Sequence, residues 1–210
     1  MATTQERRQE PRKRMPRAQR ERQMIGVAEE IFAERGYQAT SMDEIAERVG
    51  VSKPMIYEYF GSKEGLLVAC IRQARAELLT ATMTSVEGVD SAEDALRRGL
   101  VAFFEFTDSH RRSWELLRQE AAVAGQAAMD EIEAVRQQQT EVNTTLFAAY
   151  LPDLPNRDLE AYAEIVVGAC ERLAMWYAGR GDVSAADAAE LVMRMVWFGL
   201  SGATTTHGHD

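Results

Sequence analysis

The feature that most constrains the fold is a pair of short helical segments separated by a very tight turn, between residues 40 and 61. Ser41 is placed to cap the first segment, and Glu44 stands at the third helical position, from which its side chain can reach back to the cap. Gly50 then supplies the left-handed residue that ends a helix of only two turns. The spacing predicts a helix that stops abruptly.

A second short helix is predicted immediately after this turn. Ser52 is placed to cap it, Pro54 falls in its first turn, where a missing N–H costs nothing, and Gly61 ends it. Each of the two helices has one apolar side, made by Ile45, Ala46, Val49, Val51, Ile56 and Phe60. Two such helices can bury these sides only by packing on a third, so the pattern indicates a helix-turn-helix unit.

The third helix is expected before the pair, from about Ala18 to Arg35, and Gly36 ends it. Its apolar positions recur at helical spacing: Met24, Ile25, Ala28, Ile31 and Phe32. A further helix from Ser62 toward Met83 would join this head to the rest of the chain without a flexible linker.

Charge is distributed unevenly along the chain. The net charge is −9, yet residues 1–65 hold 12 Lys/Arg against 11 Asp/Glu, and residues 66–210 hold 12 against 22. Within the first 22 residues the count is eight basic against three acidic. A basic arm on a neutral head and an acidic body is the layout of a protein that approaches DNA by one end. For the first 16 residues alone, a solvated disordered tail is the alternative.

The run from Thr40 to Leu67 resembles the DNA-binding signature of the TetR family of bacterial transcriptional regulators. The resemblance lies in Gly50-Val51-Ser52, Tyr57-x-Tyr59-Phe60 and Ser62-Lys63-Glu64-x-x-Leu67, and Phe32-Ala33-Glu34-Arg35-Gly36-Tyr37 extends it. It covers roughly residues 20 to 68, about a quarter of the chain. It implies an all-α fold, with a helix-turn-helix domain joined by a helix to a larger helical domain for effector binding and dimerisation.

By this resemblance, the second helix of the pair reads DNA in the major groove. Lys53, Pro54 and Met55 match base-contacting positions, although Met55 could serve packing alone. The other expected contacts, chiefly to phosphates, are Thr40, Ser41, Ser52, Tyr57, Tyr59 and Lys63, with Arg14 and Arg17 on the arm. Tyr57 could instead belong mostly to the core, and the arm could either enter an A/T-rich minor groove or add only general attraction. Asp43 departs from the pattern, since some relatives have a base-reading residue there.

The chain beyond Gly88 reads as five or six more helices, with no strand pattern. Capping and breaking residues place them at 91–106, 111–123, 126–150, 156–178 and from 184 to about 202. Asn156 and Ser184 are the expected caps of the last two. The expected domains are a basic disordered arm (1–17), a helix-turn-helix domain (18–64), an effector-binding and dimerisation domain (65–202) and a mobile tail (203–210).

The last two of these helices carry apolar rows. In the family, such a pair packs against its twofold mate as a four-helix bundle. The resemblance therefore assigns a homodimer interface to Val166, Cys170, Leu173, Tyr177, Leu191, Met195 and Phe198. The alternative is a core within one chain, and periodicity alone does not separate the two.

The middle helices would, by the same resemblance, enclose a small apolar or amphipathic effector. The expected lining residues are Phe103, Phe104, Trp114, Leu117, Arg118, Phe147, Tyr150 and Trp176. His110, Asn143 and Glu171 could orient a polar group of the ligand. Aromatic residues at helical spacing can equally be plain core.

Several function classes lack support in the sequence. There is no Gly-rich phosphate loop, no catalytic Ser, His and carboxylate set and no Cys/His cluster, so we expect no enzyme activity, metal or cofactor. Cys70 and Cys170 are expected to be free thiols in a reducing cytoplasm. No apolar run approaches the roughly 20 residues that span a bilayer, and no membrane partner is expected.

The sequence thus predicts a homodimeric, ligand-responsive transcriptional regulator that binds a palindromic operator on double-stranded DNA, with repression as the expected mode. One alternative is a sequence-tolerant DNA-coating helix-turn-helix protein with no effector. Another is a helical binding protein whose head has lost its affinity for DNA.

Overall fold

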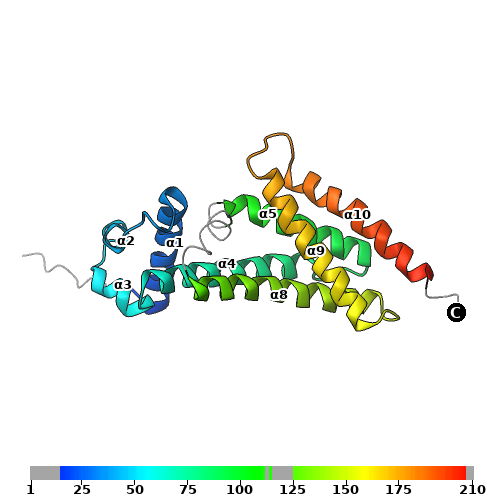
Figure 1. Cartoon of the computed structure of the whole chain (residues 1–210), viewed down its shortest axis with the longest axis horizontal. Helices are drawn as coiled ribbons and strands as arrows, with labels where there is room; N and C mark the ends of the chain where they lie inside the picture. The colour runs from blue at the N-terminus through cyan, green and yellow to red at the C-terminus, as the bar shows by residue number, and fades with distance from the viewer. Residues whose placement is uncertain (1–14, 112–113, 115–124, 207–210) are drawn as a thin grey trace, which may run out of the picture.

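The computed structural model describes residues 15–111, 114 and 125–206, with side chains as far as Trp197. This part of the chain is helical and contains no strand, which confirms the expected fold class. The helices are α1 (Arg17–Arg35), α2 (Met42–Val49), α3 (Lys53–Phe60), α4 (Lys63–Ser85), α5 (Ala92–Ser109), α8 (Gln126–Tyr150), α9 (Asn156–Tyr177) and α10 (Ala185–Thr206). Figure 1 shows an elongated molecule with α1–α3 at one end and α10 leading away from them.

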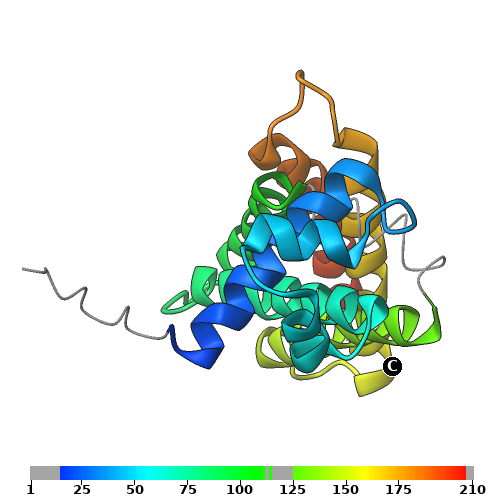
Figure 2. The ribbon, with the colours of Figure 1, turned by 90° about the vertical axis from the view of Figure 1, so that its left-hand side faces the viewer.

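The head consists of α1, α2, α3 and the start of α4 around one apolar core (Figure 2). Met24, Ala28, Ile31, Ile45 and Ile56 are fully buried in it. Gly50 lies in the left-handed region with φ 77° and ψ 38°, and the N–H of Val51 donates to the carbonyl of Ala46 at 3.0 Å. This closes α2 and turns the chain directly into α3, as the glycine predicted.

Two caps differ in detail from the sequence-based expectation. The hydroxyl of Ser41 accepts from the N–H of Glu44 at 3.1 Å, but the carboxylate of Glu44 pairs with Arg35 of α1 at 3.0 Å instead of reaching back. Ser52 occupies the N-cap position of α3 with no side-chain cap bond. Glu44 therefore binds Arg35 in place of the helix cap, and this ion pair connects α2 to α1.

The ends of the later helices also differ. Pro155, not Asn156, precedes the first residue of α9, whereas Ser184 caps α10 by accepting from the N–H of Asp187 at 3.1 Å. Helix α10 continues to Thr206, so residues 203–206 are helical where a mobile tail was expected. The helix expected at 111–123 lies outside the described residues apart from Arg111 and Trp114.

Helices α4 and α8 connect the head with the body and lie side by side along the molecule (Figures 1 and 2). Ala128 of α8 is fully buried within the head core. One turn further along α8, Glu131 accepts from Arg72 at 2.8 Å and from Arg75 at 3.3 Å, both on α4. The head is therefore held by two helices, although only α4 was predicted to link it.

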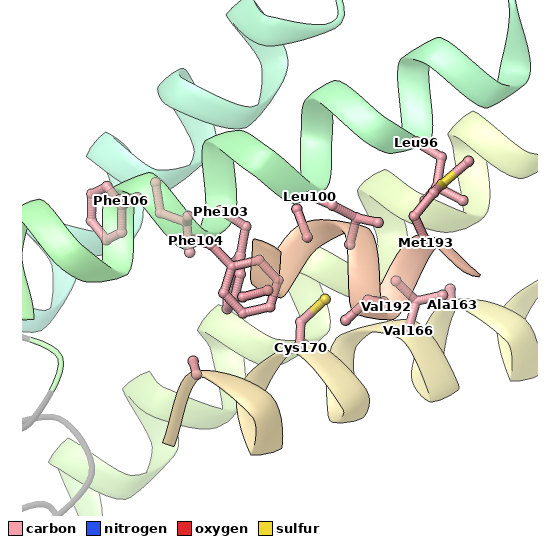
Figure 3. Packing of buried hydrophobic residues seen from close by; sticks show 14 of the residues in the cluster. Leu96, Leu100, Phe103, Phe104, Phe106, Ala163, Val166, Cys170, Val192 and Met193 are labelled. Carbon is pink, nitrogen blue, oxygen red and sulfur yellow. The ribbon is translucent and has the colours of Figure 1, made fainter. Parts of the chain in front are cut away.

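The body has its own apolar core, built from α4, α5, α8, α9 and α10. Figure 3 shows Leu100, Phe104, Cys170 and Val192 converging between these helices. Phe104 is fully buried, and the hydroxyl of Tyr177 donates to its carbonyl at 3.0 Å. Within the residues that the structure describes, no helix is long and apolar enough to span a bilayer.

Both cysteines are buried free thiols, Cys70 in the head core and Cys170 in the body. Burial raises the pKa of Cys170 from 9.0 to about 12 and raises that of Cys70 well above 9.0. Each thiol therefore keeps its proton in the folded state at a pH where the unfolded chain would lose it.

The free energy of unfolding should consequently be lower at pH 10 than at pH 8. A raised folded-state pKa stabilises the fold fully below the unfolded pKa, and this contribution is lost as the pH rises from the unfolded toward the folded value. Urea unfolding at the two pH values measures this. The variant with both Cys70→Ala and Cys170→Ala should show a smaller loss between pH 8 and pH 10 than the unmodified chain. An equal loss in the two proteins would mean that the thiols do not contribute.

Candidate functional site

Helix α3 buries one narrow side and exposes the rest. Ile56 is fully buried in the head core, whereas Lys53, Pro54, Met55 and Tyr57 are exposed. Met55 is 36% exposed and Tyr57 is 41% exposed, so neither has become a core residue. The four exposed residues lie within the first five positions of α3, the second helix of the pair, where a helix-turn-helix presents its reading residues.

Lys53 is held by a carboxylate on the neighbouring helix. Its Nζ donates to Oδ2 of Asp43 at 2.9 Å, and both side chains are exposed. This hydrogen bond, with the attraction to Asp43, raises the pKa of Lys53 above its ordinary value. The departure of Asp43 from the family pattern is thereby explained in part, because it positions the ammonium group of Lys53 across the tight turn.

Two further cations lie against aromatic rings of the head. Nζ of Lys63 donates to the carbonyl of Gln38 at 3.2 Å and lies 4.5 Å from the ring centroid of Tyr37. Cζ of Arg17 lies 4.8 Å from the ring centroid of Tyr59. Arg17 was expected in the disordered arm, but it is the first residue of α1. Cation–π contacts restrict both side chains and keep their charges at the surface.

The N-terminus of α2 is accessible, but not through both predicted side chains. Ser41 is exposed, whereas Thr40 is buried with 3% exposure. The hydroxyl of Thr40 donates to the carbonyl of Gly36 at 2.8 Å, which anchors the loop between α1 and α2. The side chain of Thr40 therefore serves the fold. Arg14 lies outside the described residues.

A cavity of about 530 Å³ lies in the body between α4, α5, α8 and α9. Phe103 and Trp114 line it, as predicted, and so do Asn143 and Glu171. The lining residues that the sequence analysis missed include Leu78, Thr82, Met83, Val86, Leu96, Leu100, Val135, Arg136, Gln139, Val142, Leu146, Val167 and Cys170. Most are aliphatic, so the search for aromatic residues overlooked them.

Four of the predicted lining residues are absent from the cavity wall. Phe104 and Phe147 are buried in the core beside it, and Tyr150 donates through its hydroxyl to the carbonyl of Val89 at 3.1 Å. Trp176 is 46% exposed, with Cζ of Arg180 at 4.3 Å from its ring centroid. Leu117 and Arg118 lie outside the described residues.

His110 is likewise not at the cavity. Its imidazole stacks on Phe106 with ring centroids 4.1 Å apart, and its Nε2 lies 3.2 Å from a carboxylate oxygen of Glu77. These contacts join the end of α5 to α4 on the outside of the cavity.

Charged groups at the cavity are concentrated on α8 and α9. Arg136 donates from Nε to both carboxylate oxygens of Glu171 at 3.0 Å, and from Nη1 to Glu133 at 3.1 Å. Burial lowers the pKa of Arg136, but its hydrogen bonds and attraction to Glu171 and Glu133 outweigh this and raise the pKa above the ordinary value. Arg136 therefore stays charged, with that charge already balanced by carboxylates.

Three of the predicted interface residues point into their own chain. Val166 and Cys170 are buried and line the cavity, and Tyr177 is bonded within the body core. Leu173 is half-buried against that core. The apolar row of α9 that looked available for a partner is thus mainly internal.

A different apolar surface is exposed on α9 and α10. Of the predicted residues, Leu191 is 37% exposed and Met195 is 83% exposed, while the side chain of Phe198 is not among those described. Ile165, at 61% exposed, and Trp176 are further exposed apolar residues on α9 and were not predicted for the interface. We call Ile165, Trp176, Leu191 and Met195 the exposed apolar row. No metal-binding group of three or more His, Cys, Asp or Glu residues occurs in the described part of the chain.

Comparison with known proteins covers both halves of the chain. Residues 25–70 match the family described as "Bacterial regulatory proteins, tetR family", and residues 92–199 match "Tetracyclin repressor-like, C-terminal domain". The transcriptional activator FasR of Mycolicibacterium smegmatis is 30% identical over 222 residues, covering 98% of each chain.

Solved structures agree with this result. A TetR-like transcriptional regulator from Rhodococcus sp. RHA1 is 36% identical, with a TM-score of 0.73 over 90% of this chain and 100% of that one. The regulator FadR from Bacillus subtilis, solved in complex with stearoyl-CoA, shares the fold, with a TM-score of 0.73 at 16% identity over 83% of this chain and 96% of that one. The matching head, body and whole-length relative together show that the chain belongs to the TetR family and is a DNA-binding transcriptional regulator.

Proposed function

We propose that the protein acts as a homodimer that binds a palindromic operator through α3 and leaves it when a small apolar or amphipathic effector enters the body cavity. The observation that carries this proposal is the cavity of about 530 Å³, two of whose wall helices, α4 and α8, also hold the head. Its volume lies within the range of small-molecule sites, and its wall is largely apolar.

The head supports sequence-specific DNA binding. Lys53 and Met55 are exposed at the start of α3, where donors and apolar groups can meet base edges in the major groove. Groups suited to phosphates lie on and around that helix, on Tyr57, Ser41, Lys63 and Arg17. A single small head makes few contacts, and two heads about 34–36 Å apart would read a palindrome together.

The exposed apolar row supports dimerisation through α9 and α10. Met195 is the most exposed of its large apolar side chains, at 83%, and monomeric proteins seldom leave several such residues together in water. Pairing α9 and α10 with their twofold copies would make a four-helix bundle and bury the row.

The connection between cavity and head supports control by an effector. Leu78 and Met83 of α4 line the cavity, and the same helix begins at Lys63 beside the proposed DNA surface. Helix α8 likewise extends from the head core at Ala128 to the cavity wall at Ala149. FadR was solved with stearoyl-CoA, which supports the capacity of this fold to bind an acyl compound.

Activation is the second candidate mode, because FasR, which matches over 98% of the chain, is named an activator. Repression and activation differ in where the operator lies relative to the promoter. A reporter assay with the protein's own operator separates them. The alternative of a DNA-coating protein without an effector gives no account of the cavity.

Genomic footprinting with the purified protein tests the proposal as a whole. The expected result is short protected sites with twofold sequence symmetry, and compounds that fill the cavity should reduce this protection. Uniform protection without a shared palindrome would contradict specific operator binding.

Within such a site, Lys53→Ala should weaken binding roughly tenfold or more and relax the preference at one symmetric pair of base positions. Fluorescence anisotropy with operator and random duplexes measures both affinities. Tyr57→Phe is the control and should weaken both duplexes alike, because it removes a phosphate contact. Equal losses on both duplexes for Lys53→Ala would assign Lys53 to the phosphates.

A further inference from the structure

A buried amide in the cavity wall has an unused donor. Gln139 of α8 lines the cavity and is only 8% exposed, and its Nε2 has no hydrogen-bond partner among the described residues. A buried donor without a partner destabilises a protein, because it has lost its hydration without gaining a hydrogen bond. An amide in this position is therefore suited to a ligand that supplies the missing acceptor.

The indole N–H of Trp114 is a second donor without a partner in the cavity wall. The indole nitrogen Nε1 of Trp114 is buried and has no hydrogen-bond partner in the described part of the chain, and Trp114 also lines the cavity. Its ring is fixed edge-on to Phe103, with centroids 5.7 Å apart. Because the indole N–H can only donate, both groups require an acceptor on the ligand.

The charges of the wall disfavour a carboxylate as that acceptor. Among the described lining residues, Arg136 is the one that is basic, whereas Glu141 and Glu171 are acidic. Arg136 is already paired with Glu171 and Glu133, so it offers no uncompensated positive charge. A carboxylate would lose its hydration without gaining a cation, which is costly in an apolar site. A neutral acceptor avoids this cost.

The arrangement of the lining residues favours an elongated ligand. On α8 they run from Val135 to Ala149, a distance of roughly 21 Å at about 1.5 Å per residue. Gln139 lies toward the head end of this stretch, and the far end is lined by Leu146 with Val86 and Leu96. An apolar chain could occupy that far end while its polar group meets Gln139.

We propose that the cavity binds a neutral ester of a medium or long alkyl chain, with the carbonyl oxygen accepting from Gln139 and Trp114 and the chain directed toward Ala149. An ester suits two donors better than an amide does, because an amide brings an N–H of its own into the apolar wall. This inference rests on the proposed function, since that function assigns the cavity to an effector.

Calorimetric titration of the full-length protein without DNA tests the ligand class. The probes are methyl decanoate, N-methyldecanamide and sodium decanoate, which share one alkyl chain. We expect the ester to bind at least about tenfold more tightly than the carboxylate, and more tightly than the amide. Equal or tighter binding of decanoate would overturn the preference for a neutral group, tighter binding of the amide would overturn the choice of an ester, and absence of ester binding would overturn the ligand class.

Variants test the two donors. Gln139→Met keeps the length of the side chain and removes the amide, and Trp114→Phe removes the indole N–H. The first should weaken methyl decanoate about tenfold and the second by a smaller factor. Gln137→Met is the matched control, because Gln137 is an exposed glutamine of the same helix and is not among the residues that line the cavity. Circular dichroism checks that each variant is folded. Unchanged ester affinity in both donor variants would overturn the assignment.

Operator binding is measured separately, so the two proposals can fail independently. If the ester binds as expected but leaves operator affinity unchanged, the ester site stands and control by this ligand fails. If another compound shifts operator affinity while no ester binds, the regulatory proposal stands and the ester site fails.

Discussion

Removing both arginines that hold Glu131, in the double variant Arg72→Ala and Arg75→Ala, is expected to lower the free energy of unfolding by about 2–4 kcal/mol. The carboxylate of Glu131 is 10% exposed and accepts from Arg72 at 2.8 Å and Arg75 at 3.3 Å. Without them, a nearly buried charge loses its partners. The estimate stands below that for a fully buried pair because Arg72 is 68% exposed and water can enter.

Removing the carboxylate of Glu131 instead of the two arginines gives a control. Glu131→Met removes the buried charge and leaves the two arginines, which can turn to water, so it should cost less than the double variant. Adding Glu131→Met to the double variant should restore most of the lost stability. Urea unfolding followed by circular dichroism measures all four proteins. A larger loss for Glu131→Met alone than for the double variant would show that the arginines, not the carboxylate, are the groups that need pairing.

The position of this cluster gives the result a functional meaning. Glu131 lies one turn from Ala128, which is part of the head core, and one turn before Val135, which lines the cavity. Loosening it should make the head less firmly attached to α8. The same double variant should therefore bind the operator less well at temperatures where it is still folded.

The head could be predicted closely because its signals are local. A glycine at position 50 in the left-handed region ends one helix and sets the direction of the next, whatever the rest of the chain does. The apolar sides of α2 and α3 likewise admit one packing on α1. The exceptions, Glu44 and Thr40, are residues whose polar groups found partners on α1 or in the loop after it.

The body was less predictable because its helices have apolar residues on more than one side. Periodicity shows that Val166 and Ile165 belong to an apolar helix, but it does not show that the first lies in the chain's own core and the second in solvent. The cavity was equally hidden. Its most informative polar residue, Gln139, lies in a run of three glutamines, and only the packing of α8 distinguishes it from its neighbours.

Met195→Arg is expected to abolish the proposed dimer and to lower affinity for a palindromic operator by roughly 10²–10⁴-fold. Met195 is 83% exposed in the single chain, so arginine there should not disturb the fold of a protomer. Across a twofold axis, however, it would bring two like charges into an apolar contact. Light scattering should then report a monomer with an unchanged circular dichroism spectrum.

The size of the loss follows from how the two heads cooperate. In a dimer, binding of the first head places the second close to its half-site, and this gain disappears when the subunits separate. Affinity for a single half-site should therefore be unchanged, while affinity for the palindrome falls to that same level. Met129→Arg is the matched control, because Met129 is 47% exposed on α8 and lies outside the exposed apolar row. A folded dimer of Met195→Arg with unaltered operator affinity would place the subunit contact on another surface, whereas a monomer that still binds the palindrome tightly would show that one head is sufficient.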